Sequence, residues 1–211
     1  SYQGYTYTEV RESVYRLAAG LIAVGLQPGE RVAILSEGRN AWITGELAVL
    51  YAGACSVPLS VKLDANTDLK FRLQHSECRF IMVSALQAPK IEEIRKALPA
   101  LEAVLYMDER PAERPGDFSF PEISAKGSDL LQLQPDCVKE RMALAGPDTL
   151  ANISYTSGTT ADPKGIMLTH LNYVTNVKQA LTLMDIPPTH RTLAILPWDL
   201  SFAHTACLYC F

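Results

Sequence analysis

Residues 31–35 read Arg-Val-Ala-Ile-Leu, a short β-rich run bounded by turn residues, as in a strand buried within a parallel sheet. Before it, apolar side chains recur at three- and four-residue spacing over residues 8–24, and Gly25 follows where a helix C-cap belongs. After it, Asn40 is placed to cap a second helix that stops at Gly53. The sequence therefore predicts a helix, a strand and a helix in succession.

The same alternation continues along the chain. Short extended runs are predicted at 55–58, 80–83 and 103–106, and helices are predicted at 67–76 and 91–98 between them. A helical bundle would not interrupt its helices with short β-branched runs. The pattern therefore predicts an α/β fold with mainly parallel sheets flanked by helices.

The pattern fades between residues 109 and 147, which are rich in proline, glycine and charge and contain one predicted helix at 138–144. Periodicity returns with a predicted strand at 152–155, a helix at 170–184 and a further strand at 193–196. We interpret residues 109–147 as a segment that connects two subdomains or two halves of the sheet system.

The bulk composition is that of a globular protein: 211 residues, 48% apolar and 20% charged. The formal net charge of −4 argues against binding nucleic acid or anionic lipid through bulk charge, because those partners require a dense cationic face. The sequence shows no signal peptide and no apolar run of roughly 20 residues. We therefore expect a cytoplasmic protein.

Five cysteines are scattered through apolar segments, an odd number that fits a reducing compartment better than a disulfide framework. Cys207 and Cys210 form a C-x-x-C pattern within an apolar run, with no second pair of ligands nearby. This context favours buried thiols over a zinc or redox site.

Residues 156–165 carry the most informative chemistry and read Thr-Ser-Gly-Thr-Thr-Ala-Asp-Pro-Lys-Gly. Glycine lets backbone N–H groups approach a ligand, hydroxyls donate to phosphate oxygens, and lysine brings a mobile positive charge. The segment follows a predicted strand, where α/β sheets bind ligands. It is not a Walker loop, since Pro163 and Gly165 flank Lys164, and it lacks G-x-G-x-x-G. The alternative is an ordinary polar surface loop.

The chain resembles the adenylate-forming (AMP-binding) superfamily of acyl-CoA synthetases, luciferases and peptide-synthetase adenylation domains. Residues 155–165 follow its signature Tyr-Thr-Ser-Gly-Thr-Thr-Gly-x-Pro-Lys-Gly except at Ala161. If that position needs a positive φ, alanine costs about 1 kcal/mol there. The family's opening segment, its core A-G-A-x-x-V-P-L motif and its L-T-H-x-N motif are matched by residues 5–10, 49–59 and 168–172. The resemblance thus covers nearly the whole chain.

The resemblance implies that a carboxylate attacks the α-phosphorus of Mg-ATP to give acyl-adenylate and pyrophosphate, and that coenzyme A then displaces AMP. The implied catalytic residues are Lys164 and Thr160, and the implied nucleotide-binding residues are Thr156, Ser157, Gly158, Thr159, Thr160, Lys164 and Gly165. The family's magnesium glutamate, its ribose aspartate and its C-terminal lysine domain do not occur in these 211 residues, so no metal ligand is assigned.

We therefore expect an N-terminal fragment that is inactive alone and belongs to the large N-terminal domain of such an enzyme. Its expected parts are a first α/β subdomain at 1–108, a connecting segment at 109–147, and at 148–211 the start of the subdomain that carries the loop. The expected partners are a small carboxylate, ATP and coenzyme A, with no nucleic acid. Membrane contact by the full-length enzyme and its oligomeric state stay open.

The choice of acid rests on residues 196–204, which resemble the region lining the acyl pocket of fatty acyl-CoA synthetases. Leu200 stands where those enzymes usually have histidine, and His204 either replaces that histidine or is a helix-face residue hydrogen-bonded to backbone. The implied pocket residues are Trp198, Leu200, Phe202 and His204. The predicted substrate is a long-chain fatty acid. The alternatives are an amino-acid or aryl-acid adenylation domain and a non-catalytic nucleotide-binding module.

Overall fold

The computed structural model describes residues 4–109, 114–156, 163–187, 189 and 191–210. Among these residues, seven strands form one sheet in the order β5-β4-β3-β1-β2-β6-β7. The strands are β1 (Arg31–Leu35), β2 (Cys55–Leu59), β3 (Phe80–Val83), β4 (Ala103–Tyr106), β5 (Phe118–Ser119), β6 (Leu150–Thr156) and β7 (Lys164–Thr169). The α-helices are α1 (Tyr7–Ala23), α2 (Asn40–Tyr51), α3 (Lys70–Ser76), α4 (Ala88–Ile94), α5 (Phe120–Leu133), α6 (Cys137–Ala143), α7 (His170–Leu183) and α8 (Ser201–Ala203).

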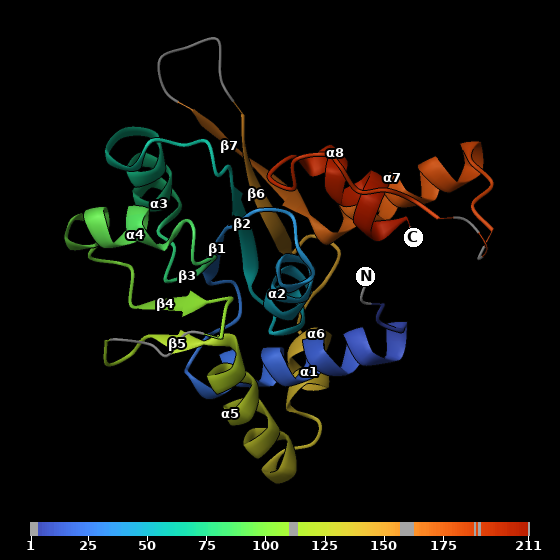
Figure 1. The fold of residues 1–211 in the computed structure, drawn as a ribbon. Helices are drawn as coiled ribbons and strands as arrows, with labels where there is room; N and C mark the ends of the chain where they lie inside the picture. Colours follow the sequence, from blue (N-terminus) through green and yellow to red (C-terminus); the bar gives the residue numbers. More distant parts are fainter. Residues whose placement is uncertain (1–3, 110–113, 157–162, 188, 190, 211) are drawn as a thin grey trace.

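Three short helical turns complete the described elements: the π-helical turns η1 (Ala65–Leu69) and η3 (His204–Tyr209), and the 3-10 turn η2 (Arg95–Ala97). Among the described strands, β1 to β6 pair in parallel with one another, and β7 pairs antiparallel with β6. Helices lie on both sides of the sheet (Figure 1). The α/β fold with a mainly parallel sheet, predicted from the sequence, is confirmed.

Alternation along β1 shows how the sheet separates two buried cores. Val32 and Ile34 belong to the cluster that packs against α1, α2, α5 and α6, whereas Ala33 and Leu35 belong to the cluster under α3 and α4. All four side chains are fully buried. A strand covered on both faces needs a continuous apolar run, which is the pattern that residues 32–35 have.

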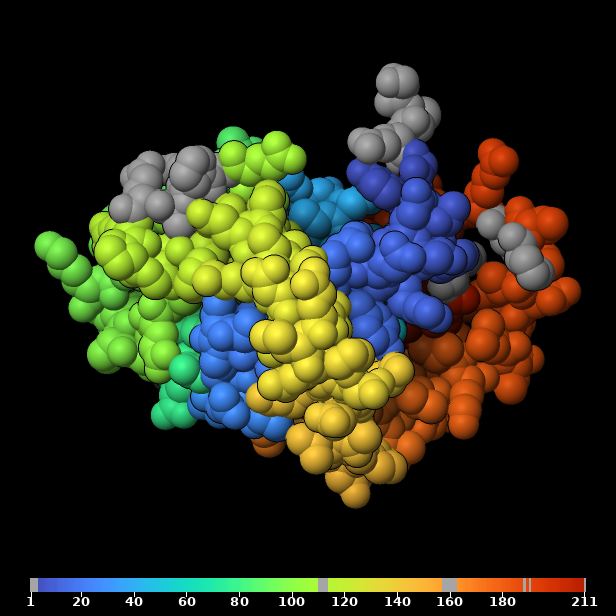
Figure 2. Space-filling view, turned by 90° about the horizontal axis from the view of Figure 1, so that it is seen from below, coloured from blue at the N-terminus to red at the C-terminus, as the bar shows by residue number. Residues whose placement is uncertain are grey.

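Helices α1 and α5 lie side by side over one face of the molecule (Figure 2). A Cβ atom at Gly127 would lie 1.8 Å from the carbonyl oxygen of Arg16, and one at Gly20 would lie 2.0 Å from the carbonyl oxygen of Ile123. The two helices therefore meet backbone to backbone, and both glycines are required by this close approach.

The sequence did not predict α5, and its prediction of a single helix within 109–147 was wrong. Besides α6, which overlaps the predicted helix at 138–144, this segment forms α5. Ser119 caps α5 in a capping box with Glu122, whose carboxylate accepts from the Ser119 backbone N–H at 2.6 Å. This Ser-x-x-Glu signature was present in the sequence, but the surrounding proline and charge masked it.

The predicted strand at 193–196 is also wrong, since these residues are in no strand. Leu193 and Ile195 are 80% and 77% exposed, so the apolar run has no sheet neighbour among the described residues. At α2 the N-cap residue is Arg39 rather than Asn40, and it makes no side-chain capping hydrogen bond.

Strand β6 continues the sheet of the preceding residues, because Asn152 pairs in parallel register with Ser56 of β2. The division into parts at 1–108, 109–147 and 148–211 stays a prediction. Among the described residues, none of the helices has both the length and the apolar composition that a membrane crossing requires.

Candidate nucleotide-binding site

An antiparallel hairpin of β6 and β7 forms the base of the candidate phosphate loop. Thr156 pairs with Lys164, and Tyr155 pairs with Gly165, so the two ends of the loop are held side by side. The predicted ligands Ser157, Gly158, Thr159 and Thr160, like Ala161, lie outside the described residues. Both Thr156 and Lys164 are exposed, and the hairpin brings their side chains to the base of this loop.

The sequence pattern does not predict β7, because Lys164 and Gly165 belong to the loop composition of residues 156–165. The short apolar run that follows Gly165 was a weak signal for this strand. At Gly165 a Cβ atom would lie 3.0 Å from Cγ2 of Ile153 and 3.5 Å from the Tyr155 ring. A side chain at this position would thus press on the partner strand, which gives Gly165 a packing role at the hairpin.

Helix α7 starts directly after this hairpin. Thr169 is its N-cap: its side-chain oxygen accepts from the Asn172 backbone N–H at 3.3 Å, and the Asn172 side chain accepts from the Thr169 N–H at 2.8 Å. His170 is the first residue of this helix. Burial lowers the pKa of His170, which favours the neutral imidazole.

A hollow of about 730 Å³ lies between α7 and the segment that contains α8 and η3. Its walls include Met167 and Leu171 on one side and Phe202 and Thr205 on the other. Of the four predicted pocket residues, Phe202 lines this hollow and is 70% exposed, whereas Leu200 is exposed outside it. The described geometry thus brings Phe202 to a cavity but does not gather all four residues around it.

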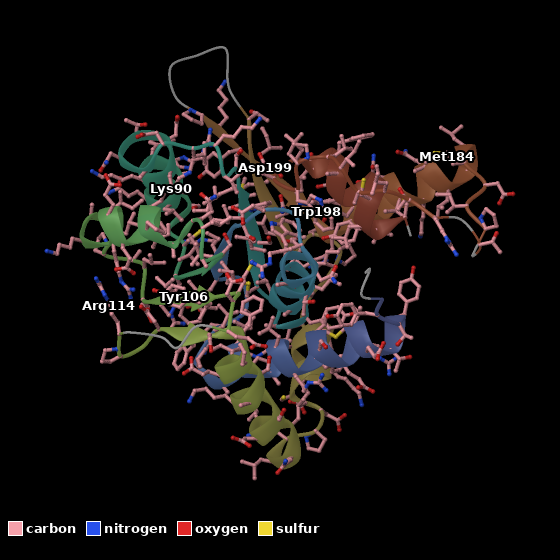
Figure 3. All side chains as sticks on the ribbon, in the orientation of Figure 1. Lys90, Tyr106, Arg114, Met184, Trp198 and Asp199 are labelled. Carbon is pink, nitrogen blue, oxygen red and sulfur yellow. The ribbon has the colours of Figure 1, made fainter. Side chains whose placement is uncertain are left out.

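Trp198 and His204 pack the segment that contains α8 and η3 against the core. Figure 3 shows Trp198 over the centre of the molecule, whereas Met184 lies at the outer end of α7. The Trp198 ring meets Trp42 edge to face, with centroids 5.1 Å apart. His204 is 1% exposed; its Nε2 donates to the Trp198 carbonyl at 2.7 Å and its Nδ1 lies 3.0 Å from the Tyr173 hydroxyl. Two alternatives were given for His204: a replacement for the family's pocket histidine, or a helix-face residue hydrogen-bonded to backbone. The bond to the Trp198 carbonyl agrees with the second.

Replacing His204 with leucine should lower the free energy of unfolding by about 1–3 kcal/mol, because the Trp198 carbonyl and the Tyr173 hydroxyl both lose a partner. Urea denaturation measures this loss. The matched control is Phe202→Ala, an exposed position where we expect a change within about 0.5 kcal/mol. Equal effects of the two substitutions would contradict the structural role of His204.

A buried carboxylate lies beneath the same segment and was not predicted. Glu46 of α2 is fully buried and accepts hydrogen bonds from the Ser56 hydroxyl and, at 3.2 Å, from the Tyr209 hydroxyl. Burial and the nearby Glu46 carboxylate raise the pKa of Tyr209 well above its usual value, so the phenol stays a donor. No sequence motif marked Glu46, because its partner Tyr209 is 163 positions away.

Among the described residues, no three histidine, cysteine, aspartate or glutamate side chains are grouped so that they could hold an ion. Cys207 and Cys210 are half-buried free thiols of the C-terminal turn.

Comparison with known proteins decides the family. The model of the family described as AMP-binding enzyme matches residues 1–211. The chain belongs to the AMP-binding enzyme family.

Relatives of this AMP-binding chain include CoA ligases. One is the 3-[(3aS,4S,7aS)-7a-methyl-1,5-dioxo-octahydro-1H-inden-4-yl]propanoyl:CoA ligase of Mycobacterium tuberculosis, 34% identical over 96% of the chain and 39% of the relative. A long-chain-fatty-acid–CoA ligase of Mycobacterium bovis is 31% identical over 83% of the chain and 28% of its own length. The crystal structure of an anthranilate CoA ligase in complex with anthranoyl-AMP has 27% identity and a TM-score of 0.70, over 83% of this chain and 32% of that one. The chain spans about two fifths or less of each.

Proposed function

We propose that the protein activates a carboxylic acid with ATP, forming acyl-adenylate and pyrophosphate, and then transfers the acyl group to coenzyme A. One observation carries the proposal: β6 and β7 bring Thr156 and Lys164 together at the base of a hydroxyl- and glycine-rich loop. The match of the whole chain to the AMP-binding model supports reading this loop as a phosphate cradle.

In this proposal the loop stabilises charge. The side chain of Lys164 is an exposed cation at the base of the loop, and its ammonium group would attract the β- and γ-phosphates. As the acid oxygen bonds to the α-phosphorus, negative charge moves onto the leaving pyrophosphate. A cation and several hydroxyl and N–H donors held around that group lower the energy of the transition state. Thr156, Ser157, Gly158, Thr159 and Thr160 are the proposed donors.

ATP is ordinarily used as its magnesium complex, and none of the described residues is proposed as a ligand of that ion. We further propose that turnover requires additional residues, since the chain covers 39% of its Mycobacterium tuberculosis relative. The chain alone is then expected to be inactive.

For the acid, we propose a long-chain fatty acid. Support comes from the Mycobacterium bovis relative, whose name gives this substrate, and from the apolar walls that Met167, Leu171 and Phe202 contribute to the hollow beside α7. A fused-ring or aromatic acid is the second candidate, because the names of two other relatives give such acids.

The test is acid-dependent exchange of labelled pyrophosphate into ATP by the full product of the gene that encodes this chain, with residues 1–211 measured in parallel. Fatty, fused-ring, aromatic and amino acids are compared at equal concentrations. Exchange highest with long-chain fatty acids is expected. Preference for another acid would correct the substrate class, and ATP binding without exchange on any acid would favour the non-catalytic nucleotide-binding module.

A further inference from the structure

The side chain of Tyr155 links the phosphate-loop hairpin to helix α3. Its hydroxyl oxygen lies 2.8 Å from Nδ1 of His75 and 3.3 Å from the carbonyl oxygen of Arg72. The Tyr155 and His75 rings meet edge to face with centroids 5.8 Å apart, and the Arg72 guanidinium lies 5.6 Å from the Tyr155 ring centroid. The Tyr155 side chain thus contacts two residues of α3, His75 and Arg72, that lie about 80 positions earlier in the sequence.

Tyr155 occupies the last position but one of β6, directly before Thr156 and the loop. Its register partner is Gly165, where a side chain would come within 3.5 Å of the Tyr155 ring. The ring is therefore confined between the second strand of the hairpin and α3. Any displacement of Tyr155 would move the base of the loop with it.

Helix α3, which carries His75, is fixed by packing and by a hydrogen bond. His75 stacks on Phe71, with ring centroids 5.5 Å apart and an interplanar angle of 20°. Leu73, on the opposite side of the helix, is 3% exposed in the core, and the Gln74 side chain donates to the Ala97 carbonyl at 2.9 Å. The imidazole is therefore presented to Tyr155 from a fixed helix although it is itself exposed to solvent.

We propose that Tyr155 and His75 are positioning residues for the phosphate loop: their hydrogen bond ties the base of the loop to α3 and sets where the loop meets the phosphates of ATP. The inference rests on the proposed function of the loop. Neither residue was among the predicted phosphate ligands. Tyr155 is the first residue of the signature at 155–165, which assigns it no role of its own.

Burial supports this arrangement, since desolvation raises the pKa of Tyr155 and keeps its phenol protonated as a hydrogen-bonding group. A positioning role predicts that loss of the bond weakens ATP binding without removing any phosphate ligand. One neutral hydrogen bond corresponds to roughly a fivefold change in affinity.

The experiment measures the dissociation constant of Mg-ATP by calorimetry, and KM for ATP and for the acid, in the full gene product. Tyr155→Phe and His75→Ala should each raise the ATP constants roughly fivefold, with KM for the acid unchanged. His75→Asn, which keeps a polar group near the Nδ1 position, should restore most of the affinity. Tyr7→Phe is the control, since Tyr7 is 82% exposed and lies on α1.

The double variant Tyr155→Phe/His75→Ala distinguishes a shared contact from two independent ones. Tyr155→Phe removes the hydrogen bond to His75 together with the one to the Arg72 carbonyl, so the double variant should bind ATP no more weakly than Tyr155→Phe alone. Unchanged ATP binding in both single variants, or a lower unfolding midpoint without loss of affinity, would overturn the inference alone. No ATP binding by the unsubstituted protein would overturn the proposed function together with it.

Discussion

Replacing Lys164 with alanine should lower kcat/KM for ATP–pyrophosphate exchange by about 100- to 1000-fold, the range found when one preorganised donor to developing charge is removed. Lys164 is exposed at the first position of β7, opposite Thr156. Its substitution therefore removes a charge from the loop without opening the core. We expect the free energy of unfolding to change by less than about 0.5 kcal/mol.

The matched control for this prediction is Lys139→Ala. Lys139 is also an exposed lysine; it lies on α6 and pairs with Asp136 at 2.7 Å. Exchange by this variant should equal that of the unsubstituted protein. If Lys164→Ala retained more than a third of the exchange activity, its ammonium group would not be the charge that stabilises the leaving pyrophosphate.

Replacing Arg95 with methionine should destabilise the fold by about 3–5 kcal/mol, because it leaves the Asp117 carboxylate buried without its cation. The guanidinium contacts both carboxylate oxygens, at 2.5 and 2.7 Å, and the Asp117 side chain is fully buried. Asp117 also accepts from the Val104 backbone N–H at 2.8 Å. The pair joins the end of α4 to β4 and β5, and its loss should loosen this edge of the sheet.

Urea denaturation of the full gene product measures this second effect. Methionine keeps most of the apolar stem of arginine, so the loss reports mainly on the charge. The control is Arg16→Met, since Arg16 forms an exposed pair with Glu12 at 3.9 Å and an exposed hydrogen bond to the Ser13 hydroxyl at 3.4 Å, and exposed pairs contribute about 0–1 kcal/mol. A loss below about 1 kcal/mol for Arg95→Met would mean that water or another group compensates Asp117.

Local sequence patterns predicted the buried parallel strands well, because burial on both faces requires consecutive apolar residues. The runs at 32–35, 80–83 and 103–106 are covered by helices on both faces, and every position in them is apolar. By contrast, β7 has exposed Lys164 and Met167 and pairs only with β6. A half-exposed edge strand has no such continuous signature.

The candidate site likewise has features that the local sequence predicts and contacts that it does not. The loop composition pointed to phosphate binding because hydroxyls, glycines and Lys164 are adjacent in sequence. The contacts of Tyr155 with His75 and of Glu46 with Tyr209 join positions 80 and 163 residues apart. The identity of a single residue does not indicate a partner so far away in sequence, so these contacts are evident only in the folded structure.

The central claim is that the acid carboxylate attacks the α-phosphorus of ATP, and the most direct measurement follows the oxygen atoms. The full gene product is supplied with a fatty acid labelled with ¹⁸O in its carboxyl group, together with Mg-ATP and coenzyme A. Mass spectrometry of the products should find one ¹⁸O in AMP and none in pyrophosphate, because the bridging oxygen of the adenylate leaves with AMP when the thiol attacks the carbonyl. Formation of ADP with ¹⁸O in phosphate would contradict the account, since it would mean attack at the γ-phosphorus through an acyl phosphate.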